Sequence, residues 1–264
     1  MPVERLIPMT FFDSVLLLAA AGGGGALNAV AGGGSFLTFP MLLFQGVPAI
    51  AANASSAVAL WPASLASAGA YRHDIRLAKA YLLSFSVASV AGGILGAQLL
   101  LHTSGTTFRS LVPWLLLFVT LVFAFGGVVV KALRKGRVPA AQTRSRASTA
   151  AGFLTQLLIA TYGGFFGGGM GIMMLATFTA LGMENIHAMN GLKNWCAVCI
   201  NGVAVVTFVA AGVVAWPQTS VMLIGGVAGG YFGASGAKKL NPLLIRRFVI
   251  ALGLVLSAYF FIQG

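Results

Sequence analysis

The sequence predicts an all-α integral membrane protein with about eight hydrophobic segments in two four-segment repeats. Three observations lead to this fold class: an apolar composition, a series of long apolar runs, and an internal duplication. Of the 264 residues, 58% are hydrophobic and 8% are charged, and the mean hydropathy is +0.94. Soluble domains carry about 25% charged residues. We therefore expect the bilayer to be the main solvent of this chain.

The apolar runs differ in length. Two of them, 13–45 and 148–181, each exceed 30 residues. A straight helix of that length would be about 50 Å long, against a hydrocarbon core of about 30 Å. We therefore expect each long run to be broken or re-entrant. The other six have ordinary span lengths of about 20–25 residues and cover 50–70, 77–101, 110–131, 187–211, 216–237 and 244–263.

Each long run contains a glycine cluster, "AGGGSFLTFP" at 31–40 and "YGGFFGGGMGIMM" at 162–174. Glycine inside a helix costs about 0.5–1 kcal/mol relative to alanine, so these clusters mark the expected breaks. A helix that restarts after a break presents free backbone N–H groups and a positive dipole end, which favour an anion. The candidate ligand-binding residues are Gly33, Gly34, Ser35, Gly168, Gly169 and Met170.

The alternative for these glycines is helix packing, since small residues let helices approach closely. Packing is the favoured interpretation of "AGGILGA" at 91–97 and "AGGYFGA" at 228–234. These two stretches match at five of seven positions when the chain is shifted by 137 residues. The same shift places Asn53 on Asn190. The matches predict a first transmembrane repeat at 1–131, a basic cytoplasmic linker at 132–147 and a second transmembrane repeat at 148–264.

Two topologies fit this duplication. If each long run crosses the membrane once, the repeats are parallel and both termini are cytoplasmic. If each long run folds back as a hairpin, the repeats are inverted and both termini lie outside. The inverted arrangement puts the basic residues at 72–79, 131–146 and 238–247 all inside, so the positive-inside rule favours it.

In their order and duplicated placement, "GGGSFLTFP", "GGFFGGGMGIMML" and "HAMNGLKNW" resemble the TauE/SafE family of sulfite exporters and related permeases. The resemblance covers essentially the whole chain. It implies a multi-pass protein of the cytoplasmic (inner) membrane that transports a small anion, such as sulfite or a sulfonate. It also implies coupling to an ion gradient, for example of H⁺ or Na⁺. The first-half counterpart of "MNGLKNW" reads "ANASSAVAL" and lacks the lysine.

Lys193 lies inside an apolar run, where an ionisable side chain costs about 2.5–3.5 kcal/mol and by default marks a functional site. At 100° per residue, His187, Asn190, Asn194 and Asn201 share an arc of about 60° on the same helix, and Lys193 lies beside it. A lysine among amide donors suits an anion. The alternative is that Lys193 snorkels to a nearby interface while the asparagines bond neighbouring helices.

The matching first-half helix carries a weaker polar stripe of Asn53, Ser56 and Ser64, and we take Asn53 and Ser56 as further candidates. The net charge of +12 is explained by loop residues, so we expect no nucleic-acid partner. Three histidines and four acids are too few and too scattered for an enzyme. Cys196 and Cys199 lack further metal ligands, so we expect no metal and no cofactor. An anion-selective channel with the same lining remains the alternative, and no oligomeric state is predicted.

Overall fold

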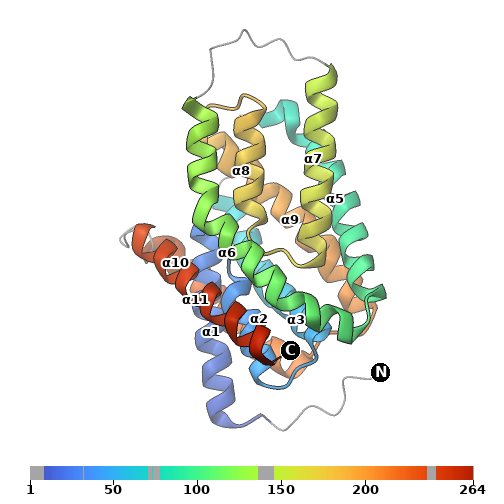
Figure 1. Ribbon diagram of the computed structural model, residues 1–264, viewed down its shortest axis with the longest axis vertical. Helices are drawn as coiled ribbons and strands as arrows, with labels where there is room; N and C mark the ends of the chain where they lie inside the picture. The colour runs from blue at the N-terminus through green and yellow to red at the C-terminus, as the bar shows by residue number, and fades with distance from the viewer. Residues whose placement is uncertain are drawn as a thin grey trace.

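The computed structural model describes residues 9–31, 33–70, 73, 78–135, 146–236 and 242–263 (Figure 1). The regular elements of this part are all helical, as the composition predicts. In chain order they are α1 (Phe11–Ala31), α2 (Ser35–Phe44), α3 (Ala49–Ala70), α5 (Lys79–His102), α6 (Gly105–Lys135), α7 (Arg146–Phe165), α8 (Met170–Ala180), α9 (Ile186–Ala210), α10 (Trp216–Gly236) and α11 (Pro242–Gln263).

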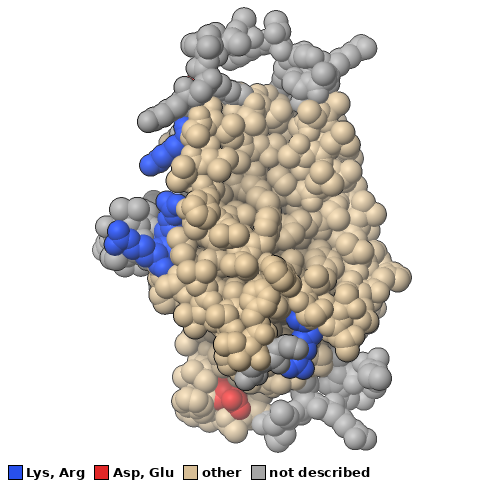
Figure 2. Space-filling model, viewed as in Figure 1, with Lys and Arg blue, Asp and Glu red and all other residues tan. Residues whose placement is uncertain are grey.

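Within the described residues, five helices are long and apolar enough to cross a membrane: α1, α3, α5, α6 and α9. Three shorter apolar helices cover Ser35–Phe44, Ala150–Phe165 and Met170–Ala180. Large aliphatic and aromatic side chains are exposed along α5, α6 and α11. The face seen in Figure 2 carries its lysines and arginines at the margins. An apolar exterior of this kind is suited to lipid.

Both long apolar runs contain two helices. In the run at 13–45, α1 ends at Ala31 and α2 begins at Ser35, and in the run at 148–181, α7 ends at Phe165 and α8 begins at Met170. The interruptions fall at the two glycine clusters. A succession of glycines is not sufficient by itself, because Gly22–Gly25 lie inside α1. At the second break, Gly167 and Gly169 adopt positive φ, which ends the helix.

The second helix of each pair returns beside the first. At the end of α2, the Gln45 side chain donates from Nε2 to the backbone carbonyl of Asp13, at the start of α1, over 3.1 Å. In the second half, Gly152 near the start of α7 lies against Leu181, which follows α8. A Cβ on this glycine would be 2.9 Å from Leu181 Cδ1.

Helices from the two halves of the chain are interleaved. The helix α1 packs on α10, α7 on α5, α3 on α9, and α6 on α11. A Cβ on Gly92 would lie 2.6 Å from Ala160 Cβ on α7, and one on Gly229 would meet the backbone of Gly22 on α1. The prediction that the two "AGG" stretches serve close helix packing is therefore confirmed at these positions.

Side chains define several helix ends. Asn185 caps α9 by accepting hydrogen bonds from the backbone N–H groups of His187 and Ala188, at 2.9 and 3.1 Å. Thr10 and Asp13 bond one another at the start of α1, where Thr10 Oγ1 lies 2.7 Å from the carboxylate. The predicted linker at 132–147 lies largely outside the described residues, since α6 ends at Lys135 and the description resumes at Arg146.

Candidate functional site

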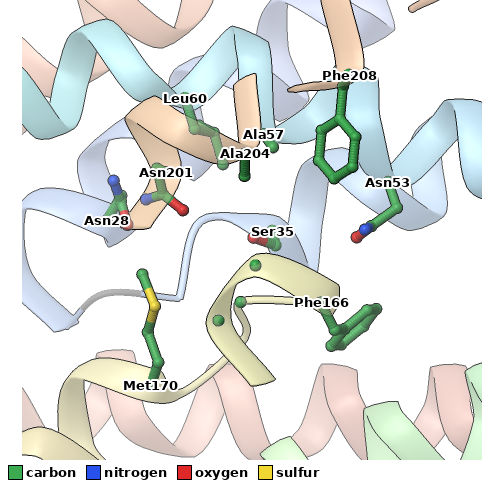
Figure 3. A pocket seen from close by; sticks show the side chains of 13 residues that line it. Asn28, Ser35, Asn53, Ala57, Leu60, Phe166, Met170, Asn201, Ala204 and Phe208 are labelled. Atoms are coloured by element: carbon green, nitrogen blue, oxygen red, sulfur yellow. The ribbon is translucent and has the colours of Figure 1, made fainter. Parts of the chain in front are cut away.

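A small cavity of about 30 Å³ lies where the interrupted helices restart (Figure 3). Three asparagines from three helices line it, Asn28 on α1, Asn53 on α3 and Asn201 on α9, and we call it the asparagine cavity. Its lining draws on both halves of the chain and includes no charged side chain. The other lining residues are Ser35, Ala57, Leu60, Gly163, Gly164, Phe166, Gly167, Met170, Ala204 and Phe208.

The asparagines occupy two sides of the cavity. In Figure 3, Asn28 and Asn201 lie on one side, and Asn53 lies on the other with Phe166 and Phe208. Asn28 donates from Nδ2 to Ser64 Oγ over 3.0 Å. Asn53 donates from Nδ2 to the carbonyl of Phe165 over 2.9 Å. Because an asparagine amide has two N–H donors, each keeps a second donor for a ligand.

Asn201 differs from the other two asparagines. Within the described part of the chain, its side chain makes no hydrogen bond to another residue, although it is only partly exposed. Buried amides normally have hydrogen-bond partners. The Asn201 amide is therefore fully available to a ligand or to water in the cavity.

The first residues of α2 and α8, Ser35 and Met170, both line the cavity. Neither helix has a side chain capping its N-terminus. At the start of α2 the backbone N–H groups of Phe36 and Leu37 already donate to the carbonyls of Gly33 and Gly34, and at the start of α8 that of Ile172 donates to Gly169. Both helix starts still carry the positive end of the helix dipole. The α7–α8 turn depends on glycine, because Gly167 and Gly169 have φ values of 81° and 73°, where side chains are disfavoured.

The four glycines predicted to approach a ligand lie beside the cavity and contact neighbouring helices. A Cβ on Gly33 would lie 2.5 Å from Phe123 Cζ, and one on Gly34 would meet the Gly24 carbonyl. A Cβ on Gly168 or Gly169 would lie 3.0 or 3.1 Å from the side chain of Val119 on α6. Of the residues predicted around the breaks, the cavity lining includes Ser35 and Met170 but none of these glycines.

The remaining predicted residues also lie outside the cavity lining. Ser56 is buried and lies 2.6 Å from the hydroxyl of Thr38. Asn190 donates to the carbonyl of Ile186, one turn back on its own helix, over 3.0 Å. His187 is exposed and Asn194 is partly buried. Lys193 is 8% exposed, and its side chain packs against Gly171 at the start of α8.

Two lining residues with polar side chains, Asn28 and Asn201, were not among the predicted site residues. Asn201 is on the polar stripe of α9, and that stripe could have identified it. Asn28 is the only asparagine in the run at 13–45, and its place just before the glycine cluster was the available signal. Among the described residues, no three His, Cys, Asp or Glu side chains gather to form a metal site.

Several helices of the described part of the chain are long and apolar enough to cross a membrane, as in a multi-pass membrane protein. The family model for the sulfite exporter TauE/SafE matches residues 16–260, and the chain therefore belongs to this family. The protein is a membrane transporter of this family.

Several curated proteins are similar along most of their length. A probable membrane transporter protein of Haemophilus influenzae is 28% identical over 242 residues, 88% of each chain. The probable membrane transporter protein ORF9 of a Sinorhizobium species is 25% identical and covers 83% of each chain. The probable membrane transporter protein YfcA of Escherichia coli K12 is 25% identical over 88% of this chain and 83% of its own. No solved structure matches the chain.

Proposed function

We propose that this protein is a secondary transporter that moves a small sulfur-containing anion, such as sulfite or a sulfonate, across the cytoplasmic membrane. The asparagine cavity is the proposed substrate site. The observation that carries this proposal is the meeting of two uncapped helix N-termini, at Ser35 and Met170, with three asparagine side chains in one cavity.

The chemistry of the lining favours an oxyanion. Asparagine amides and the first N–H groups of a helix are hydrogen-bond donors, and the dipoles of α2 and α8 add positive potential without a formal charge. Binding an anion through neutral donors also keeps its affinity moderate, and a carrier needs moderate affinity to release its substrate. The N–H donors of Asn201 have no protein acceptor in the described part of the chain.

The cavity size favours a compact substrate. A volume of about 30 Å³ is on the scale of one or a few water molecules, since one water needs about 10–15 Å³ measured in this way. A compact oxyanion matches this scale better than a long organic acid does. The aromatic rings of Phe166 and Phe208, on the Asn53 side, contribute an apolar wall for a sulfonate with a short carbon chain.

We interpret α1–α2 and α7–α8 as re-entrant hairpins that enter the membrane from opposite sides. The contacts of Gln45 with Asp13 and of Gly152 with Leu181 support a turn back within each run. The packing is also paired: α1 packs on α10 as α7 packs on α5, and α3 and α6 pack on their own counterparts α9 and α11. This pattern is expected of two inverted repeats, a common plan among secondary transporters.

In this topology the asparagine cavity lies between the two repeats, at the tips of both hairpins. The loops after α3, α6 and α10 are cytoplasmic, and both termini lie outside. Rocking of one repeat against the other would expose the cavity to each side in turn. The driving gradient is an H⁺ or Na⁺ gradient in this proposal, by analogy with secondary transporters.

Transport is tested with purified protein in liposomes loaded with sulfite. We expect efflux that saturates with sulfite concentration and responds to an imposed H⁺ or Na⁺ gradient, because a carrier has a finite turnover and couples its ions. An anion flux per protein molecule that is well above carrier turnover rates, seen as single-channel currents, would show that the protein is an anion channel and not a carrier. If the protein releases no sulfite above the rate of empty liposomes but does transport an unrelated solute, the proposed substrate class is refuted.

A further inference from the structure

Lys193 has an environment that the asparagine cavity does not explain. It is on α9 and only 8% exposed. Its aliphatic stem packs against the first turn of α8, where a Cβ on Gly171 would lie 3.3 Å from Lys193 Cδ. Within the described residues, Lys193 has no ion pair and no hydrogen bond, and the described carboxylates, on Asp13 and Glu184, are not bonded to it.

This placement is unfavourable without an additional negative charge. A buried ammonium group needs a partner to offset its lost hydration. The nearby N-terminus of α8 carries a positive dipole end and unpaired N–H groups, which repel a cation. An anion held between Lys193 and the first turn of α8 would satisfy both groups.

From this arrangement we propose a second anion-binding position at Lys193, between α9 and the start of α8 and separate from the asparagine cavity. This inference rests on the proposed function, in that the ligand is the transported anion on its way to or from the cavity. Met170 lines the cavity while the next residue, Gly171, contacts Lys193. The two positions therefore share one helix N-terminus and are adjacent steps of a path.

The position is asymmetric between the two halves of the chain. The shift of 137 residues that aligns Asn53 with Asn190 places Ser56 on Lys193. Ser56 is a neutral side chain already bonded to Thr38 at 2.6 Å. In the proposed topology, the α8 hairpin opens to the cytoplasm, so the charged position faces the cytoplasmic side alone. There it would raise the local concentration of the anion before it enters the cavity.

Bromide, a compact anion with an anomalous X-ray signal, tests the position directly. We expect bromide-soaked crystals of the whole protein to show a peak beside Lys193 and the first turn of α8. In Lys193→Met, which keeps the stem and removes the charge, this peak disappears. Absence of the peak in the wild-type protein overturns the inference, whether or not bromide occupies the asparagine cavity.

Sulfite flux in liposomes tests whether the position belongs to the path. For Lys193→Met, we expect the half-saturating sulfite concentration on the cytoplasmic side to rise roughly tenfold or more, the loss expected for one charge-assisted hydrogen bond. In buffer without added sulfite or bromide, the temperature of unfolding of Lys193→Met should not be lower than that of the wild-type protein, because the variant removes an unpaired buried charge.

The outcomes separate this inference from the proposed function. If Lys193→Met leaves the sulfite dependence unchanged while Asn201→Leu abolishes flux, the inference is overturned, the proposed function stands, and any bromide at Lys193 is an adventitious ion only. If the wild-type protein moves no sulfite, the proposed substrate fails. The presence or absence of the bromide peak at Lys193 then decides whether an anion binds there.

Discussion

The Asn53 side chain, on α3 in the first half of the chain, donates a hydrogen bond to the carbonyl of Phe165, the last residue of α7, over 2.9 Å. Asn53 is 4% exposed. This bond satisfies one of the carbonyls that a helix end leaves unpaired. It also joins the two halves of the chain at the edge of the asparagine cavity, so Asn53 combines a structural contact with a second N–H donor at the proposed substrate site.

Replacing Asn53 with alanine should weaken both roles. The Phe165 carbonyl loses its partner in a part-buried hydrogen bond, which costs about 0.5–1.5 kcal/mol, and the cavity loses a donor. We expect Asn53→Ala to lower the temperature of unfolding in detergent and to reduce sulfite flux. Asn190→Ala is the matched control, because Asn190 donates only to Ile186 on its own helix. Equal loss of stability in both variants would contradict a special role for the Asn53–Phe165 bond.

Asn201→Leu should act on binding rather than on folding. The leucine removes a donor with no protein acceptor in the described part of the chain and fills part of the cavity. We expect the affinity for sulfite, measured by isothermal titration, to fall roughly tenfold or more, with little change in the temperature of unfolding. The control is Asn194→Leu, two turns earlier on α9 and outside the cavity lining. A larger effect from Asn194→Leu would move the site away from the asparagine cavity.

The glycines at the breaks should resist substitution for structural reasons. In Gly34→Ala the new Cβ meets the Gly24 carbonyl, and overpacking of this kind costs about 1–3 kcal/mol. In Gly169→Ala a residue with φ of 73° gains a side chain, at a cost of about 1–2 kcal/mol. Gly105→Ala is the control, because nothing lies within 4 Å of its added Cβ. If Gly105→Ala lowers the temperature of unfolding more than Gly34→Ala and Gly169→Ala do, the structural role of these contacts is contradicted.

The inverted topology can be tested by labelling single cysteines in a background with Cys196 and Cys199 replaced by alanine. Gln45→Cys, after α2, should react with an impermeant maleimide added outside intact cells. Glu184→Cys, at an exposed position after α8, should react only when the reagent reaches the cytoplasm. Both sites follow the second helix of a hairpin, so they occupy equivalent positions in the two repeats. Labelling of both from the same side would favour parallel repeats.

Much of the fold could be predicted because its signals are local. Apolar runs too long for one span, each with a glycine cluster, predicted the two helix interruptions. The structure has those interruptions between α1 and α2 and between α7 and α8. The apolar composition and the series of long apolar runs together predicted an all-helical membrane protein. The number of full spans was less predictable, because each interrupted run is divided into shorter helices.

The site was harder to predict, because a polar stripe shows which side of a helix faces the protein interior but not which position along the helix lines a cavity. His187, Asn190, Asn194 and Asn201 share one side of α9, yet Asn201 alone among them lines the cavity. The other three lie about two to four turns nearer the start of the helix. Asn28 was not assigned, since its role depends on its contact with Ser64 on α3 and on the cavity that it shares with Asn201 of α9.

The most direct test of the account is to locate the bound substrate. Selenite has the shape and charge chemistry of sulfite and an anomalous X-ray signal from selenium. In crystals of the wild-type protein soaked with selenite, we expect an anomalous peak inside the asparagine cavity, within hydrogen-bond distance of Asn201 and of the first turns of α2 or α8. A cavity without selenium, in crystals that bind selenite elsewhere along the helices, would contradict it.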